Sequence, residues 1–280
     1  MSYKRILTIQ DISCVGQCSL TVALPIISAL GVETAVLPSA VLSTHTGGFS
    51  GYTFRDLTED MPSISDHWLK EGITFDAFST GYLGSIKQIE YIQEIMRRHA
   101  SEKTIRIVDP VLGDNGSLYK GFNNDFVEAM KRLIASSDVI LPNITEASML
   151  TGKEYKESYD RSYIDSLLKE LQAIGAKTIV MTGVSYKPET TGVVVFENNK
   201  YNYYEHKRIP KLCHGTGDII ASAFTGAISR GLSAFDASKL AADYTLKTIE
   251  YTLDDSDHWY GVKFELAIPY LVELIAKYNI

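Results

Sequence analysis

Two glycines, a threonine and an aspartate stand where a late apolar helix, expected over residues 217–230, begins. The backbone amides of Gly215, Thr216 and Gly217, together with the helix dipole, would bind an anion without a basic side chain. Because a carboxylate repels phosphate, we interpret Asp218 as a base that takes a proton from a hydroxyl nucleophile. The stretch therefore fits a hydroxyl kinase. It fits equally well a helix N-terminus whose first-turn acid has no catalytic role.

A second polar pair follows a predicted strand in the stretch LPNITEAS, residues 141–148. Asn143 and Glu146 have the spacing of a capping box, in which each side chain bonds the other residue's backbone amide. The same amide and carboxylate would also suit Mg²⁺, mainly through water, because Mg²⁺ gives up its waters reluctantly. Taken alone, this stretch favours capping.

Two more acids lie in the stretch VDPVLGDNGSLY, residues 108–119. Asp109 ends a predicted strand, and Asp114 lies in a loop rich in Gly and Asn. Acids at these positions would order cations near nucleotide phosphates, but ordinary turns use the same residue types.

The elements that must position these residues alternate between strand and helix through residue 183, which predicts a mainly parallel sheet covered by helices on both faces. Residues 191–206 read as an antiparallel hairpin at one edge, with Asn198 and Asn199 at its turn. Residues 38–55, rich in Ser, Thr and Gly, read as a functional loop. We expect a three-layer α/β/α fold in a single domain, residues 1–280. The strands are expected over residues 5–9, 33–37, 75–81, 104–110, 138–143 and 177–183, and the last helix over about 269–277.

In such a sheet, ligands bind beyond the carboxyl ends of the strands. The unusual polar and glycine residues of this chain fall at those predicted ends. Their position alone predicts a ligand site there, without recognition of any motif. They are Asp11, the loop 43–48, residues 80–82, residues 109–114, Asn143, Thr182 and Gly183.

Composition narrows the function classes. The chain has 280 residues and a formal charge of −7, and it contains no basic block, so nucleic-acid binding is not expected. No apolar run reaches bilayer length, so we expect no membrane association. Three cysteines at wide spacing argue against a disulfide framework and favour the reducing cytoplasm.

Several of these stretches together resemble the pyridoxal/pyridoxamine kinases of the ribokinase superfamily. GTGD at a late helix, NITE after a middle strand and DPVLGDNGSLY between strands resemble the superfamily pattern. STHTGG (43–48) is similar to the substrate-flap motif of the family, STGYLGS (79–85) to its strand-end motif, and LTIQDISCVGQCSL (7–20) to its first βα unit. The resemblance spans residues 4 to about 250 and assigns nothing after Leu253.

The resemblance implies ATP-dependent phosphorylation of the 5′-hydroxyl of pyridoxal, pyridoxamine and pyridoxine. It also implies a cytoplasmic homodimer that uses Mg²⁺, with K⁺ as a candidate second cation. Asp218 would be the base, beside the amides of Gly215, Thr216 and Gly217. The remaining implied roles are these: substrate contacts from Asp11, His45, Thr46, Gly47 and Tyr82; nucleotide contacts from Asp109, Asp114, Tyr119, Asn143, Thr182 and Gly183; and the Mg²⁺ environment from Glu146, Asn143 and Asp109.

Two departures from the family pattern stand out. Asp11 occupies a position where many members have serine, so it is a candidate for setting vitamer preference, with helix capping as the alternative. No lysine clearly matches the expected nucleotide contact, and Lys187 is a candidate only. Hydroxymethylpyrimidine kinase activity and a non-catalytic vitamer- or nucleotide-binding role stay open as alternatives.

Overall fold

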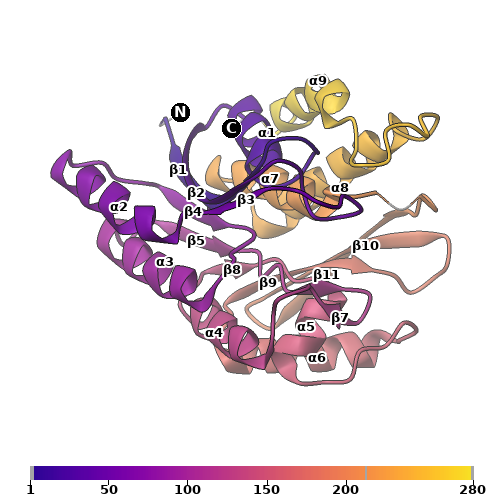
Figure 1. The fold of residues 1–280 in the computed structure, drawn as a ribbon. Coiled ribbons are helices and arrows are strands. Elements are labelled where there is room, and N and C mark those ends of the chain that lie inside the picture. Colours follow the sequence, from indigo (N-terminus) through magenta and orange to yellow (C-terminus); the bar gives the residue numbers. More distant parts are fainter. Residues whose placement is uncertain (1–2, 212, 279–280) are drawn as a thin grey trace.

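One sheet of nine strands runs through residues 3–211 and 213–278, which are the residues that the structure describes. In this computed structural model the strand order is β11-β10-β9-β8-β5-β4-β1-β2-β3 (Figure 1). Pairing is parallel from β2 across to β9 and antiparallel at both edges, as expected for a mainly parallel sheet. The strands are β1 (Arg5–Ser13), β2 (Glu33–Leu42), β3 (Phe54–Asp56), β4 (Ala77–Thr80), β5 (Ile105–Val108), β8 (Val139–Ile140), β9 (Thr178–Val184), β10 (Thr190–Glu197) and β11 (Lys200–Lys207).

Successive strand residues enter different cores, because side chains alternate between the faces of a sheet. Ile179 of β9 packs into one core and Val180 into the other, and Val108 and Ile107 of β5 divide in the same way. Both faces are therefore buried, which explains why these strands read as continuous apolar runs.

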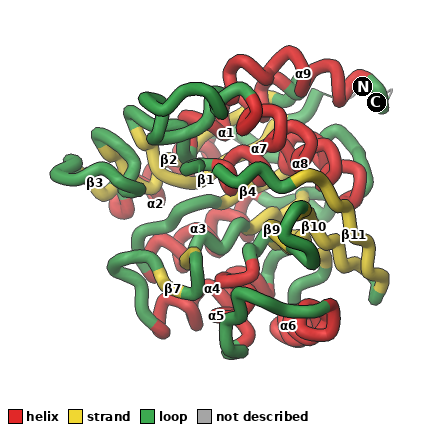
Figure 2. The backbone as a smooth tube through the Cα atoms, turned by 90° about the vertical axis from the view of Figure 1, so that its right-hand side faces the viewer, coloured by secondary structure: helices red, strands yellow, loops and turns green. Residues whose placement is uncertain are grey.

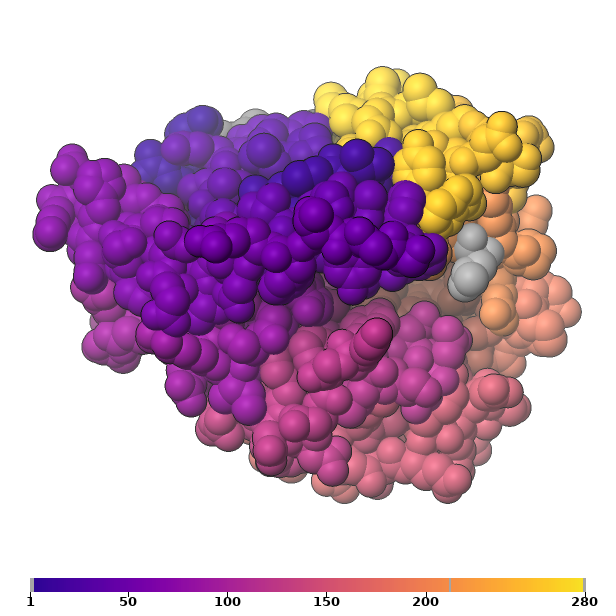
Figure 3. All heavy atoms as spheres, in the orientation of Figure 1, coloured from indigo at the N-terminus to yellow at the C-terminus, as the bar shows by residue number. Residues whose placement is uncertain are grey.

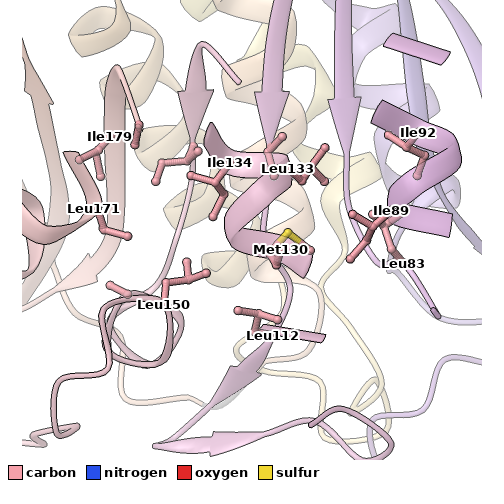
Figure 4. Close-up of a cluster of buried hydrophobic side chains, with 14 of the residues drawn as sticks. Leu83, Ile89, Ile92, Leu112, Met130, Leu133, Ile134, Leu150, Leu171 and Ile179 are labelled. Carbon is pink, nitrogen blue, oxygen red and sulfur yellow. The ribbon is translucent and has the colours of Figure 1, made fainter. Parts of the chain in front are cut away.

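Helices cover each face, so the predicted three-layer α/β/α fold is confirmed (Figures 1 and 2). On one face, Met130, Leu133 and Ile134 of α4 point toward the strands (Figure 4). That layer comprises α2 (Met61–Lys70), α3 (Ile86–His99), α4 (Asn124–Ala135), α5 (Ile144–Thr151) and α6 (Arg161–Ile174). The opposite layer comprises α1 (Leu20–Ala29), α7 (Thr216–Ser229), α8 (Ala234–Glu250) and α9 (Phe264–Ala276). Among the described residues, no helix combines the length and the apolar character needed to cross a bilayer.

Part of the segment predicted as a loop, residues 38–55, is sheet. β2 continues to Leu42, with Ala40 and Leu42 buried, and its end pairs with β3. Pro38 misled the prediction, since proline lacks the amide that a central strand needs. It is tolerated because β3 pairs only with residues from Ala40 onward, so the missing amide costs no bond on that edge.

Two hairpins differ in how well they could be foreseen. The predicted edge hairpin is present as β10 and β11, and Asn198 and Asn199 have the positive φ values that a tight turn needs. A shorter one, β6 (Gly113–Asp114) with β7 (Ser117–Leu118), was not predicted. The last helix also starts at Phe264 rather than near Pro269, because buried Phe264 and Ala267 continue its apolar face.

Candidate active site

The predicted anion-binding turn opens α7. Gly215 precedes the helix with φ 77°, and a Cβ there would lie 1.8 Å from the Gln17 carbonyl oxygen, so only glycine fits. Side chains cap the N-termini of α3, α4, α5, α6 and α8, whereas no described side chain caps α7, as is also true of α1, α2 and α9. A Cβ at Gly217 would meet nothing within 4 Å among the described residues, so the first turn of α7 is open to a ligand.

Asp218 lies in that first turn and is half-buried. Its carboxylate accepts hydrogen bonds from the Ser19 backbone amide and the Cys18 thiol, both at the start of α1. Burial, and secondarily the charge of Asp11, raise the pKa of Asp218 to about 7. A carboxyl group with this pKa exchanges protons near neutral pH, as a general base must.

Asp11 lies beside Asp218 at the end of β1 and is 4% exposed. It accepts hydrogen bonds from Ser13 Oγ at 2.8 Å and Ser19 Oγ at 2.5 Å. The alternative role, capping of α1, is not the one seen, since these partners are side-chain hydroxyls rather than helix amides. Burial raises the pKa of Asp11, with the hydrogen bonds from Ser19 and Ser13 acting in the opposite direction.

We use the word flap for residues 43–51, which contain the predicted motif 43–48; the His45 amide of this segment donates to the Val15 carbonyl, just after β1, at 3.3 Å. His45 is 5% exposed; its Nδ1 accepts from the Gly47 amide at 3.1 Å, so its Nε2–H donates to the Tyr260 carbonyl at 2.6 Å. Thr46 is exposed. Figure 3 shows a hollow between the purple surface that contains this segment and the magenta surface from the middle of the chain.

Tyr82 follows β4 and is half-buried. Its ring stacks on Phe122, with the ring centroids 5.8 Å apart, and its carbonyl accepts from Ser39 Oγ at 3.1 Å. Burial and the nearby charge of Asp11 raise the pKa of Tyr82. The structure thus brings Tyr82 and Asp11 together, although they lie far apart in the sequence.

Asn143 and Glu146 form the capping box that their spacing predicts. Asn143 Oδ1 accepts from the Glu146 amide at 2.9 Å, and Glu146 Oε2 accepts from the Asn143 amide at 2.8 Å. Both side chains also hold the next loop: Glu146 Oε1 accepts from the Leu112 amide at 3.0 Å, and Asn143 Nδ2 donates to the Gly113 carbonyl at 3.0 Å. Capping therefore accounts for these two residues in the absence of any ligand.

Asp109 lies near Glu146 and Asp218. Burial raises the pKa of Asp109 well above its usual range, and the charges of Glu146 and Asp218 raise it further. Asp11, Asp218, Asp109 and Glu146 thus form a row of carboxyl groups that repel their neighbours. A cation would relieve that repulsion, so the donor chemistry of the row fits Mg²⁺.

The arrangement does not enclose a metal ion with protein ligands alone. Among the described residues, no group of three or more His, Cys, Asp or Glu side chains is placed to hold one. Mg²⁺ in this row would therefore keep water and phosphate oxygens as ligands, as it commonly does.

The other predicted nucleotide residues line the same end of the sheet. The Thr182 amide donates to the Pro142 carbonyl at 3.0 Å, which places Thr182 beside Asn143. Gly183 is exposed with φ 70°. Asp114 is exposed and bonds the Asn115 amide at 2.9 Å, which is turn chemistry.

Tyr119 belongs to this set although it is 42% exposed: burial and the charges of Glu146, Asp114, Asp109 and Asp218 raise its pKa. Lys187 lies apart and directs its ammonium group to Glu205, 3.3 Å away on β11.

Two features of the site escaped sequence reasoning. The contact of Cys18 with Asp218 joins residues two hundred positions apart, and no spacing rule links them. Trp259 and Tyr260, in a segment that had no assignment, contact the flap. Aromatic residues clustered in a polar tail were the only available signal.

Comparison with known proteins places this geometry in a family. The family model of phosphomethylpyrimidine kinase matches residues 24–262. A pyridoxal kinase of Dictyostelium discoideum is 29% identical over 241 residues, which is 79% of this chain and 77% of the relative.

Two solved structures are similar over nearly the whole chain. The pyridoxal kinase of Lactobacillus plantarum has a TM-score of 0.89 at 33% identity, covering 99% of this chain and 98% of that one. A Bacteroides thetaiotaomicron protein, assigned to the phosphomethylpyrimidine kinases and crystallised with pyridoxal, has a TM-score of 0.90 at 34% identity, covering 96% of each chain. The chain therefore belongs to the phosphomethylpyrimidine kinase family, within the ribokinase superfamily and alongside pyridoxal kinases.

Proposed function

We propose that this protein transfers the γ-phosphoryl group of ATP to the 5′-hydroxyl of the B6 vitamers pyridoxal, pyridoxamine and pyridoxine. The observation that supports this proposal most strongly is Asp218, whose pKa is raised to about 7 at the open N-terminus of α7. A base and an anion site in one helical turn suit phosphoryl transfer to a hydroxyl group, because such catalysis consists mainly of positioning and electrostatic stabilisation.

Each group would act on a different part of the reaction. The amides of residues 215–217 and the dipole of α7 would hold the transferring phosphoryl group. Asp218 would accept the proton of the 5′-hydroxyl as its oxygen attacks the γ-phosphorus and ADP leaves. Preorganised donors contribute roughly 10²–10³ in rate, and a positioned base contributes roughly 10²–10⁴.

The row of carboxyl groups would serve the nucleotide through cations. Asp109, Glu146 and Asn143 would orient water bound to Mg²⁺, which neutralises charge on the ATP phosphates when it is bound. Thr182, Gly183, Asp114 and Tyr119 would border the nucleotide, with K⁺ as a candidate second cation.

The vitamer would lie under the flap. Tyr82 offers a ring face for stacking on the pyridine ring, and His45, Thr46 and Gly47 would close over it. Asp11 would pair with a protonated ring nitrogen or a polar ring substituent. The pyridoxal in the crystals of the Bacteroides thetaiotaomicron protein supports a B6 vitamer as substrate.

Hydroxymethylpyrimidine kinase activity is the second candidate, and the matching family model favours it. Both substrates present a hydroxymethyl group on a heteroaromatic ring, so the same Asp218 would serve either. A non-catalytic binding protein would have no need for a carboxyl group with a raised pKa at an anion site.

A substrate comparison tests the proposal. ADP release is measured with pyridoxal, pyridoxamine, pyridoxine, hydroxymethylpyrimidine and a sugar, and mass spectrometry identifies each product. The proposal predicts the highest kcat/KM on a B6 vitamer, with one phosphate added at the 5′ position. Preferential turnover of the pyrimidine would replace the substrate assignment, and no turnover of any alcohol would remove the kinase assignment.

A further inference from the structure

The segment between α8 and α9 lies against the flap. This C-terminal loop, residues 254–263, packs the Trp259 ring on the Phe49 ring, with centroids 4.6 Å apart. The ring also covers the flap backbone, since a Cβ on Gly48 would lie 2.8 Å from it. In Figure 3 the yellow C-terminal atoms border the purple surface beside the hollow.

The same loop fixes the flap histidine. The Tyr260 carbonyl accepts the Nε2–H of His45 at 2.6 Å, and the other ring nitrogen accepts the Gly47 amide. Both ring nitrogens are therefore engaged. The ring is also held from its other side, because a Cβ on Gly16 would lie 2.1 Å from His45 Cδ2. Its orientation beside Asp11 thus depends on a carbonyl of the C-terminal loop.

The loop also contacts the chain that leads into the anion-binding turn. Lys211 Nζ donates to the carbonyl of Asp255 in the loop, and to that of Leu253 just before it, at 3.3 Å in each case. His214 packs on His45, with ring centroids 5.4 Å apart. The flap, the approach to α7 and the C-terminal loop therefore meet at one point.

The loop has a defined internal structure of its own. Asp255 accepts hydrogen bonds from the amides of Asp257 at 3.0 Å and His258 at 3.2 Å, and it pairs with Lys263 at 2.5 Å. Trp259 nevertheless stays 46% exposed. An exposed indole on a well-anchored loop gains little from core burial, and its main contacts are with the flap.

We propose that the C-terminal loop is a positioning element of the vitamer site, in which Trp259 and the Tyr260 carbonyl hold the flap and His45 over Asp11. This inference rests on the proposed function. It predicts that the loop sets the affinity for the vitamer while leaving the affinity for ATP unchanged, because its contacts lie on the flap side of the site.

Kinetics of Trp259→Ala test the inference. Losing the aromatic contact should raise KM for pyridoxal about ten-fold, with KM for ATP within two-fold and Tm within two degrees of wild type. Trp259→Phe should restore most of the affinity. Tyr251→Ala is the matched control, because Tyr251 is also exposed, at 44%, but contacts Lys247 rather than the flap.

Fluorescence provides a readout that needs no turnover. The chain has two tryptophans. Trp68 packs against His99 and against Phe75, which precedes the amino end of β4, whereas the site lies at the carboxyl end, so Trp68→Phe leaves Trp259 as the reporter. Pyridoxal without ATP should change Trp259 emission in a saturable way, and ATP alone should not. The inference would be overturned if Trp259→Ala left KM for pyridoxal unchanged and if pyridoxal did not change the emission of Trp259.

The parent enzyme separates the two levels of failure. Trp68→Phe is the parent enzyme here. If it phosphorylates pyridoxal and Trp259→Ala has the same KM for pyridoxal, the positioning role is wrong and the proposed function stands. If the parent prefers the pyrimidine, the vitamer assignment is wrong, and the same two measurements with the pyrimidine then decide the role of the loop.

Discussion

Asp218→Asn should abolish most turnover and at the same time stabilise the fold. The substitution keeps one oxygen as an acceptor for the Ser19 amide but removes the group that takes the proton. We expect kcat to fall by roughly 10²–10⁴-fold, with ATP affinity unchanged. A loss of turnover alone would not distinguish a base from a residue that shapes the site, so the stability measurement is the sharper half of the prediction.

The sign of the stability change follows from the raised pKa. The pKa of Asp218 is about 7 in the folded chain and 3.8 in the unfolded chain, so its contribution to the free energy of unfolding is greatest below pH 3.8 and is lost as the pH rises to about 7. The free energy of unfolding above that pH is lower than below pH 3.8 by on the order of 4 kcal/mol. Water reaches the half-buried carboxylate, so we take about half of that value.

Asp218→Asn should therefore raise Tm at pH 8 by about 4 °C, and by less at pH 5. Calorimetry in EDTA without nucleotide measures this, and Asp125→Asn, an exposed first-turn acid on α4, is the control. Turnover within a few-fold of wild type, or a lower Tm at pH 8, would refute the reasoning.

The remaining predictions concern the groups around the base and the nucleotide loop. Cys18→Ala removes a donor that lowers the pKa of Asp218, so the acid limb of the plot of kcat/KM against pH should move to higher pH. Cys18→Ser should bring the limb back toward its wild-type position, and Cys14→Ala should leave it unchanged. Asp11→Asn removes a charge that raises the same pKa, so that limb should move to lower pH and the ratio of rates on pyridoxal and pyridoxamine should change; an unmoved limb would contradict the electrostatic coupling. Asn143→Ala should lower the free energy of unfolding by about 1 kcal/mol through loss of the α5 cap, measured by urea titration, and an unchanged midpoint would count against it.

Local signals were enough to predict most of the fold. The apolar runs of β1, β4, β5 and β9 are buried on both faces, and the paired asparagines at 198 and 199 specify a tight turn. The end of β2 could not be read, because Pro38 and the polar residues after it imitate a loop. The end of β2 is held in the sheet by its pairing with β1 and β3, and local sequence does not reveal that pairing.

The site divides in the same way. Asp218 and the capping box of Asn143 and Glu146 were readable because helix N-termini have local rules. The thiol of Cys18 beside Asp218 and the carbonyl of Tyr260 on His45 were not readable, since each contact joins segments that only tertiary folding brings together. The proposed base and the helix cap were thus visible in sequence, whereas the groups that contact and position the proposed site were not.

A crystal structure with pyridoxal and a non-hydrolysable ATP analogue tests the central claim most directly. The account predicts the 5′-hydroxyl oxygen within about 3 Å of an Asp218 carboxylate oxygen, with the γ-phosphate facing the amides of residues 215–217. A 5′-hydroxyl directed away from Asp218, or a γ-phosphate bound away from the N-terminus of α7, would contradict it.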